Sequence, residues 1–134
     1  MSRENVNIVR AALNAWASDG HEAFVEYLTD DIDYRAIEGA PDDRGPMHGK
    51  DAFRAYVQDW LDTFDDVRTE VVDLSDAGED NVIAVLRVSG RAKLSGVETD
   101  LTYAVVYTVR DGKIARGREH AMRDEALENA GLSE

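Results

Sequence analysis

Residues 98–121 read ETDLTYAVVYTVRDGKIARGREHA and carry the clearest structural signal in the chain. In the first half, large apolar side chains alternate with small or polar ones, which is typical of a β-strand with one buried face. Asp111 and Gly112 then favour a tight turn, because both residue types tolerate the positive φ of a type I′ turn. The stretch therefore predicts a β-hairpin around which the other elements are arranged.

The second strand of this hairpin has two different faces. One carries Arg116, Arg118 and His120, and the other carries Ala115, Gly117, Glu119 and Ala121. Because the charged face must contact water, Glu119 is predicted to point inward. Its small neighbours leave volume around the carboxylate, which is the pattern of a pocket that contains an acid. The alternative is a Glu119 that is solvated or paired with an arginine of a neighbouring strand, since structural ion pairs also resemble sites.

The composition indicates one acidic domain, residues 1–134. The chain has 134 residues, 43% of them hydrophobic, which is enough for a single core that buries about two thirds of the surface. The formal charge of −13, from 28 acids and 15 bases, disfavours nucleic acid and anionic membranes as partners. There is no cysteine, and no apolar run reaches the roughly 20 residues that span a bilayer. A cytoplasmic protein that binds a small molecule or another protein is expected.

Hydrophobic periodicity predicts helices on both sides of a first strand, followed by a run of strands. Helices are expected over about 3–18, over 21–28, from position 49 or 50 onward, and over 124–130. Strands are expected at 32–36, 69–74 and 81–93, before the hairpin. The loop over 37–47 holds both prolines and is expected to be exposed and to act as a flap. This order predicts an α+β fold, a cone-shaped, strongly curved antiparallel sheet wrapped around helices, with a ligand at the mouth of the cone.

Several short stretches carry a family resemblance: the helical start through Trp16, LTDDIDY at 28–34, GPMHG at 45–49, DGKI at 111–114 and REH at 118–120. With them the chain resembles the SnoaL-like polyketide cyclases. These belong to the nuclear-transport-factor-two-like superfamily, which also includes ketosteroid isomerases and limonene-type epoxide hydrolases. The resemblance covers nearly the whole chain and implies the nuclear-transport-factor-two-like, or cystatin-like, fold. One fold hosts many chemistries, so the reaction must be argued from the site.

The resemblance carries over only part of the catalytic groups. The three positions that serve ketosteroid isomerases correspond to Ala12, Ala36 and Val105, so that chemistry is not expected. The acid on the last strand of the polyketide cyclases and epoxide hydrolases corresponds to Glu119, which matches in type. The epoxide hydrolases also use an Arg-x-Asp pair, whose arginine corresponds to Arg87. The residue two positions further on is a serine, so epoxide hydrolysis by paired acids is disfavoured.

Glu119 is therefore the predicted general acid or base of a proton-transfer enzyme of the isomerase, cyclase or hydratase type. The expected substrate is a small apolar organic molecule. Burial raises the pKa of a carboxyl group towards neutrality, which suits abstraction of a proton next to a carbonyl or protonation of a leaving oxygen. The candidate ligand-binding residues are Trp16, Tyr34, Tyr56, Trp60, Arg87, Tyr103, Val105 and Tyr107, and Tyr34, Tyr103 or Tyr107 would stabilise an oxyanion.

Alternatives stay open at this point. Aromatic residues at core spacing also fit plain packing, and Arg87 faces either Glu119 or solvent on the convex side. The alternative function is a non-catalytic small-ligand-binding or dimerisation module of the same fold.

Two further expectations concern metals and assembly. Three histidines without HExxH spacing, in a chain without cysteine, predict no metal site, and no cofactor is expected. A homodimer is predicted through the outer face of the sheet. The residues of that face, Thr102, Ala104, Val106 and Thr108, are too small and uncharged for a strand face left in water.

Overall fold

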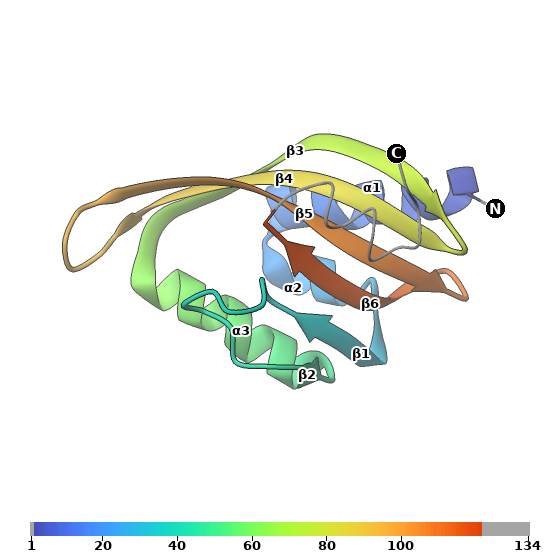
Figure 1. Ribbon diagram of the computed structural model, residues 1–134, viewed down its shortest axis with the longest axis horizontal. Coiled ribbons are helices and arrows are strands. Elements are labelled where there is room, and N and C mark those ends of the chain that lie inside the picture. The colour runs from blue at the N-terminus through green and yellow to red at the C-terminus, as the bar shows by residue number, and fades with distance from the viewer. Residues whose placement is uncertain (1, 122–134) are drawn as a thin grey trace.

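The computed structural model describes residues 2–121, which form one curved sheet and three helices (Figure 1). The helices are α1 (Ser2–Asp19), α2 (His21–Val25) and α3 (Lys50–Thr63). The strands are β1 (Leu28–Arg35), β2 (Met47–His48), β3 (Phe64–Gly78), β4 (Asn81–Ala92), β5 (Glu98–Arg110) and β6 (Lys113–His120). The helix predicted over 124–130 lies outside the described residues. The hairpin of β5 and β6 and the helices α1 and α3 are confirmed, whereas α2 is shorter and β3 longer than predicted.

The sheet is mixed, with the strand order β2-β1-β6-β5-β4-β3. All neighbouring strands are antiparallel except β1 and β6, which run parallel and place Tyr34 beside Gly117. The sequence pattern predicts an entirely antiparallel sheet because periodicity marks a strand but not its partner. A parallel pair needs a long connection, and here the connection contains α3 and the four strands β2, β3, β4 and β5. This pairing is what brings the N-terminal and C-terminal parts of the chain together.

Left-handed turns fix the ends of several elements. Asp111 and Gly112 join β5 to β6 with φ of 53° and 81°, which confirms the tight turn predicted for this pair. Gly49 precedes α3 with φ of 90°, a conformation that glycine adopts most readily. Its N–H donates to the carbonyl of Ile32, 2.7 Å away, and so ties the start of α3 to β1.

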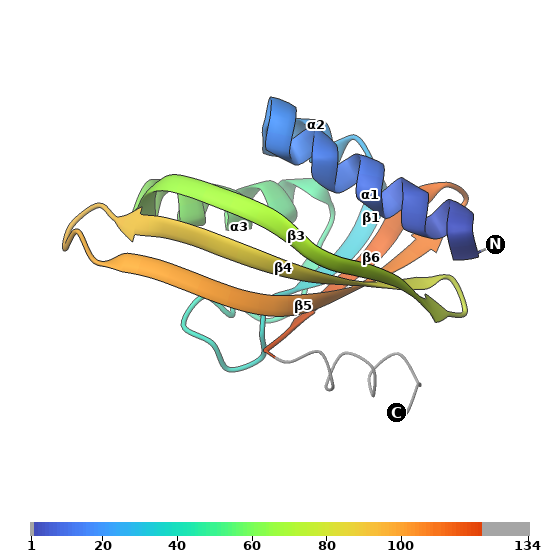
Figure 2. The same ribbon diagram turned by 90° about the horizontal axis from the view of Figure 1, so that it is seen from above.

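The three helices cover the concave side of the sheet, where the main core lies (Figure 2). Its residues come from α1, α2, α3 and the inward positions of the strands. A series of aromatic contacts crosses this core. The ring of Trp16 lies 5.0 Å from that of Phe24, and Phe53 lies 5.7 Å from Phe24 and 4.9 Å from Tyr34, between ring centroids. These ring contacts therefore connect α1 to β1 through one continuous core. None of the described helices is long and apolar enough to cross a membrane.

The outer face of the sheet has its own apolar cluster. Ala77, Ile83, Ala104 and Val106 are buried together there. The dimer prediction assumes that Ala104 and Val106 need a partner subunit to cover them. That assumption is wrong, because both side chains are buried within the single chain, at 1% and 5% exposure. The larger exposed apolar side chains lie instead on β3 and at the β4–β5 end of the sheet: Val71, Val72, Leu94, Val97 and Leu101.

Candidate active site

Glu119 lies near the end of β6, on the concave face of the sheet. Its side chain is buried, at 8% exposure, opposite Val105 on β5, which confirms the predicted inward orientation. Gly117 shares this buried face, but Ala121 is exposed beyond the end of β6. Ala115 is the extra residue of a bulge in the pairing with β5, and it is half-buried. The acid is therefore enclosed by larger side chains than the pattern predicts.

The ring of Tyr34 fills the space next to Gly117. These residues are neighbours across β1 and β6, and a β-carbon on Gly117 would lie 2.5 Å from the ring atoms Cδ2 and Cε2 of Tyr34. A glycine in a strand marks such a close approach. The prediction that Gly117 leaves open volume beside Glu119 is therefore wrong, since the glycine instead makes room for an aromatic ring.

Two tyrosine hydroxyls contact the Glu119 carboxylate. The hydroxyl of Tyr34, from β1, donates to Oε2 at 2.6 Å. The hydroxyl of Tyr56, from α3, lies 3.2 Å from both Oε1 and Oε2. The two rings pack against each other with 5.9 Å between their centroids. A strand and a helix that are tied together at Gly49 therefore present one phenol each to the same acid.

Burial raises the pKa of Glu119 from its ordinary 4.5 to about 7. The hydrogen bonds from Tyr34 and Tyr56 stabilise the ionised form and oppose this change, while the negative charge of Asp42 adds to it. Burial, followed by the charge of Glu119, also raises the pKa of Tyr34 and of Tyr56 well above the usual range for tyrosine. Near neutral pH the site therefore holds two neutral phenols and one carboxyl group that exchanges its proton.

Asp42 is a second acid at the site. It lies in the loop over 36–46 that joins β1 to β2, and its Oδ2 is 3.1 Å from the hydroxyl of Tyr56 and 2.9 Å from Nε1 of Trp60. The sequence pattern marks this part of the chain only as an irregular loop and does not single out Asp42. No periodicity marks a loop residue, so the sole signal in the sequence is the adjacent pair of acids at positions 42 and 43.

The neighbouring acid, Asp43, fixes the shape of this loop. Its carboxylate accepts hydrogen bonds from the N–H groups of Gly39 and Gly45, each at 2.9 Å, and from the guanidinium of Arg35 at 3.2 Å. These bonds, those of the two glycines first, lower the pKa of Asp43 to about 2. The loop is therefore folded onto its own carboxylate, and Asp42 is held facing Tyr56 and Trp60.

The remaining candidates divide between the site and the rest of the core. Tyr103 is half-buried on the concave face, close enough for the charges of Glu119 and Asp42 to raise its pKa after the larger effect of burial. Tyr107 and Val105 are buried in the core, with Tyr107 beside Gly117 and 6.3 Å from the ring of Phe24.

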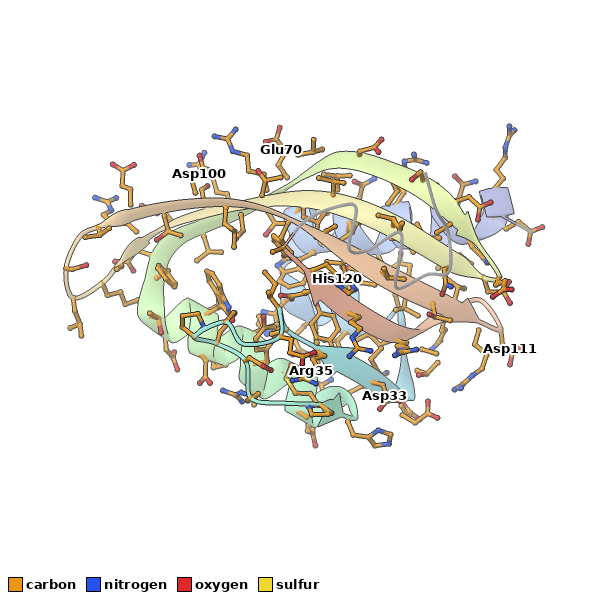
Figure 3. All side chains as sticks on the ribbon, viewed as in Figure 1. Asp33, Arg35, Glu70, Asp100, Asp111 and His120 are labelled. Carbon is orange, nitrogen blue, oxygen red and sulfur yellow. The ribbon has the colours of Figure 1, made fainter. Side chains whose placement is uncertain are left out.

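Two predicted ligand-binding residues lie away from Glu119. Trp16 packs on Phe24 and on the edge of Phe53 in the core. Arg87 faces solvent on the convex side, where its side chain bonds to Asp100 at 2.8 Å and lies 4.0 Å from Glu70. Both acids lie on the outer side of the sheet in Figure 3. Of the two alternatives left open for Arg87, the structure shows the solvent-facing one, because alternation along β4 turns the side chain at this position outward. Arg87 is therefore not a ligand-binding residue of the Glu119 site.

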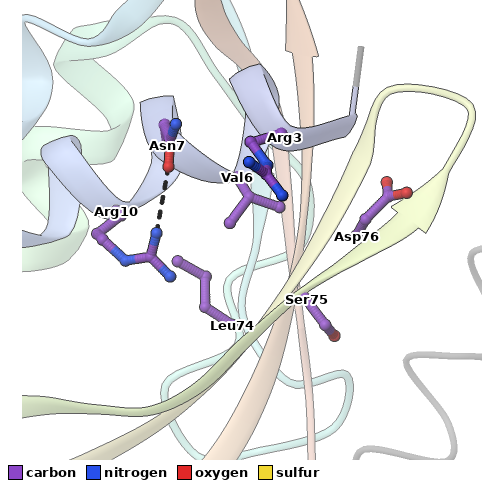
Figure 4. A pocket seen from close by; sticks show the side chains of 7 residues that line it. All are labelled: Arg3, Val6, Asn7, Arg10, Leu74, Ser75 and Asp76. Carbon is purple, nitrogen blue, oxygen red and sulfur yellow. Dashed lines mark hydrogen bonds between the residues drawn. The ribbon is translucent and has the colours of Figure 1, made fainter.

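A separate open groove of about 590 Å³ lies between α1 and β3 (Figure 4). It is lined by Arg3, Val6, Asn7, Arg10, Leu74, Ser75 and Asp76. None of these residues belongs to the Glu119 site, and the only hydrogen bond drawn among them joins Arg10 to Asn7 at 3.2 Å. Among residues 2–121, no group of three or more His, Cys, Asp or Glu side chains is arranged to hold a metal ion.

Comparison with known proteins places this geometry in a family. Residues 9–117 match the family model described as a SnoaL-like domain. The chain belongs to the SnoaL-like family. In this SnoaL-like domain, Tyr34, Asp42, Tyr56 and Trp60 lie inside the matched region, whereas Glu119 follows it by two residues. No curated protein matches the chain significantly.

Solved structures show the same fold for the SnoaL-like domain. A nuclear-transport-factor-two-like protein from Burkholderia thailandensis is 26% identical, with a TM-score of 0.77 over 86% of this chain and 88% of that chain. A protein from Catenulispora acidiphila with a ketosteroid isomerase-like fold, in complex with trimethylamine, is 18% identical, with a TM-score of 0.70 over 93% and 92%. TerC, co-crystallised with polyporic acid, is 16% identical, with a TM-score of 0.75 over 96% and 98%. The curved sheet with helices on one side is therefore the nuclear-transport-factor-two-like fold.

Proposed function

We propose that this SnoaL-like protein is a proton-transfer enzyme of the isomerase, cyclase or hydratase type, with Glu119 as its general acid and base. The observation that carries the proposal is a buried carboxyl group between two phenols, with a pKa raised to about 7 by burial. A general acid or base works best when its pKa lies near the operating pH, because both protonation states are then populated.

The proposed chemistry is removal of a proton from a carbon next to a carbonyl group. Ionised Glu119 accepts that proton and returns it to another atom of the substrate, while a tyrosine hydroxyl donates a hydrogen bond to the developing oxyanion. Tyr34 and Tyr56 suit this second task because their raised pKa keeps them neutral and able to donate. The two residues change partners during the reaction, from the Glu119 carboxylate to the substrate oxygen.

The proposed substrate is small and largely apolar. The surroundings of Glu119 are aromatic: Tyr34 and Tyr56 contact its carboxylate, and the half-buried Trp60 binds the same Asp42 carboxylate as Tyr56. Two proteins of the same fold support a small organic ligand, since one was solved with trimethylamine and the other was co-crystallised with polyporic acid.

Solvent deuterium exchange tests the proposal without knowledge of the product. The protein is incubated with cyclohexanone and with acetophenone in deuterium oxide at neutral pD, and proton NMR follows the loss of the signal next to the carbonyl. Wild-type protein should accelerate the exchange, Glu119→Gln should abolish the acceleration, and Glu70→Gln on the outer face should keep it. Equal rates for the wild type and Glu119→Gln contradict the proposal.

A second candidate function, a non-catalytic binding module, is favoured by one observation. Both carboxylate oxygens of Glu119 are already hydrogen-bonded within the protein, and the ring of Tyr34 occupies the space above Gly117. Saturation-transfer NMR on the same two ketones separates the functions. Contact between ketone and protein without any exchange assigns the site to binding alone.

A further inference from the structure

Asp42 and Glu119 share the single hydroxyl of Tyr56. The hydroxyl oxygen lies 3.1 Å from Oδ2 of Asp42 and 3.2 Å from each oxygen of Glu119, so the two carboxylates are separated by no more than the sum of these distances. A phenol has one proton and donates one hydrogen bond at a time. Tyr56 therefore donates to either Asp42 or Glu119, and the protonation state of Glu119 decides which of the two accepts.

The pairing of these two acids is unfavourable as a purely structural feature. Like charges at this separation repel, and a carboxylate is normally buried beside a cation. Within residues 2–121, no Lys, Arg or His side chain forms an ion pair with Asp42 or with Glu119. The loop nevertheless holds Asp42 in place, through Asp43 on one side and Nε1 of Trp60 on the other. Two acids held this close together without a cation are typical of functional sites.

We propose that Asp42 is a positioning residue that controls the protonation of Glu119 through the shared Tyr56 hydroxyl. The inference rests on the proposed acid–base role of Glu119 and adds a second acid to it. Asp42 acts on Glu119 rather than on the substrate.

The direction of the hydrogen bonds explains this control. When Glu119 is ionised, Tyr56 donates to it. When Glu119 holds a proton, its O–H donates to the Tyr56 oxygen, and Tyr56 donates in turn to Asp42. The ionised Asp42 therefore stabilises the protonated form of Glu119 in two ways, by accepting from Tyr56 and by its charge. The proton that Glu119 gains comes from the substrate or from water, whereas the proton of Tyr56 stays on its own oxygen and only changes its acceptor.

Within the part of the chain that the structure describes, the other titratable groups that interact with the charge of Glu119 are neutral near neutral pH. They are Tyr34 from β1, Tyr56 from α3, and Tyr103 and Tyr107 from β5, and burial raises the pKa of each of them. Asp42 is the acid whose charge acts on Glu119 from the loop. Removal of this one charge should therefore be visible in the titration of Glu119.

The test is a carbon-13 NMR titration of the Glu119 carboxyl carbon in glutamate-labelled protein, without any substrate. The signal is assigned by its absence from Glu119→Gln. Asp42→Asn keeps the shape of the side chain and should lower the titration midpoint by about one to two pH units, from a Coulomb interaction across roughly 6 Å at an effective dielectric constant of about 20 to 40. Glu38→Gln removes a charge from an exposed position of the same loop and should leave the midpoint where it is.

A second background tests the role of the hydroxyl. In Tyr56→Phe, the substitution Asp42→Asn should still lower the midpoint through the lost charge, but by less than in the wild type, because the hydrogen bonds through the hydroxyl are absent. An unchanged midpoint in Asp42→Asn overturns the inference, and so does an equal shift in both backgrounds, because Tyr56 is then not the link. The deuterium-exchange assay is a separate readout. A protein that titrates as expected but exchanges no ketone proton contradicts the proposed function alone, and an active protein with an unshifted Asp42→Asn contradicts this inference alone.

Discussion

Replacing Gly117 with alanine adds one methyl group at the point where β6 passes the Tyr34 ring. The new carbon would lie 2.5 Å from two ring atoms, about 1 Å inside normal carbon–carbon contact. The ring cannot simply turn away, because Phe53 and Tyr56 pack against it at 4.9 and 5.9 Å between centroids. Gly117 is not in the left-handed region, so the backbone itself tolerates alanine.

The expected loss of stability follows from these contacts. Overpacking of a buried site costs about 1 to 3 kcal/mol, and displacement of the Tyr34 hydroxyl from Glu119 adds roughly 1 to 2 kcal/mol. Alanine regains about 0.5 kcal/mol over glycine in a strand. We therefore expect Gly117→Ala to lower the free energy of unfolding by about 2 to 4 kcal/mol, which is a midpoint shift on the order of 1 to 2 M urea.

Urea unfolding followed by tryptophan fluorescence measures this shift, and two controls isolate its cause. Gly90→Ala, on β4, places its new carbon 3.3 Å from the nearest atom and should cost much less. In the Tyr34→Ala background, Gly117→Ala should be neutral, because the ring that it strikes is gone. If Gly117→Ala unfolds at the wild-type urea concentration, the ring of Tyr34 is not held against β6, and the geometry argued for Glu119 does not hold.

Two further predictions concern Glu119 and the outer face. Since the pKa of Glu119 is about 7 in the folded protein and 4.5 ordinarily, the folded state binds more protons between these values. The contribution of Glu119 to the free energy of unfolding is therefore largest below pH 4.5. It falls by about 3 kcal/mol as the pH rises through neutrality. Glu119→Gln should remove that slope in urea unfolding, and the same slope in both proteins refutes the assignment. Val106→Lys should unfold the domain, because Val106 is buried within the chain, and a stable variant contradicts this. The proposed homodimer then needs another surface, and sedimentation of the wild type as a monomer at micromolar concentration contradicts the dimer itself.

The sequence predicts well what a periodic pattern encodes. Alternation along 98–121 marks the hairpin and the inward face of Glu119, and apolar spacing marks α1 and α3. In each case, one face of the element is buried, and apolar residues recur at the period of that element. The sequence pattern therefore predicts both the type of element and its buried face. The family resemblance, also drawn from the sequence, is confirmed by the match over residues 9–117.

The parts that the sequence does not predict depend on contacts between distant positions. Nothing local to Tyr34 indicates that it pairs with Gly117, 83 positions further on, and fills the space there. Asp42 lies in a loop without periodicity, so its approach to Tyr56 follows only from the folded loop. The outward position of Arg87 depends on the register of β4, which one shifted residue would reverse.

The position of β6 in the sheet has a consequence for synthesis on the ribosome. Of the strands in residues 2–121, β6 is the last to be made, yet it lies in the middle of the sheet between β1 and β5. Until residues 113–120 leave the exit tunnel, β1 has only the two-residue β2 as a partner, and β3, β4 and β5 form a separate sheet. Tyr34 and Tyr56, whose hydroxyls contact Glu119, then lie in a part of the chain that cannot yet pair with the sheet of β3, β4 and β5. A nascent chain that stops short of β6 lacks the strand that joins β1 to β5, and not merely an edge strand. This protein should therefore acquire its fold and its acid–base site together, after translation has passed β6.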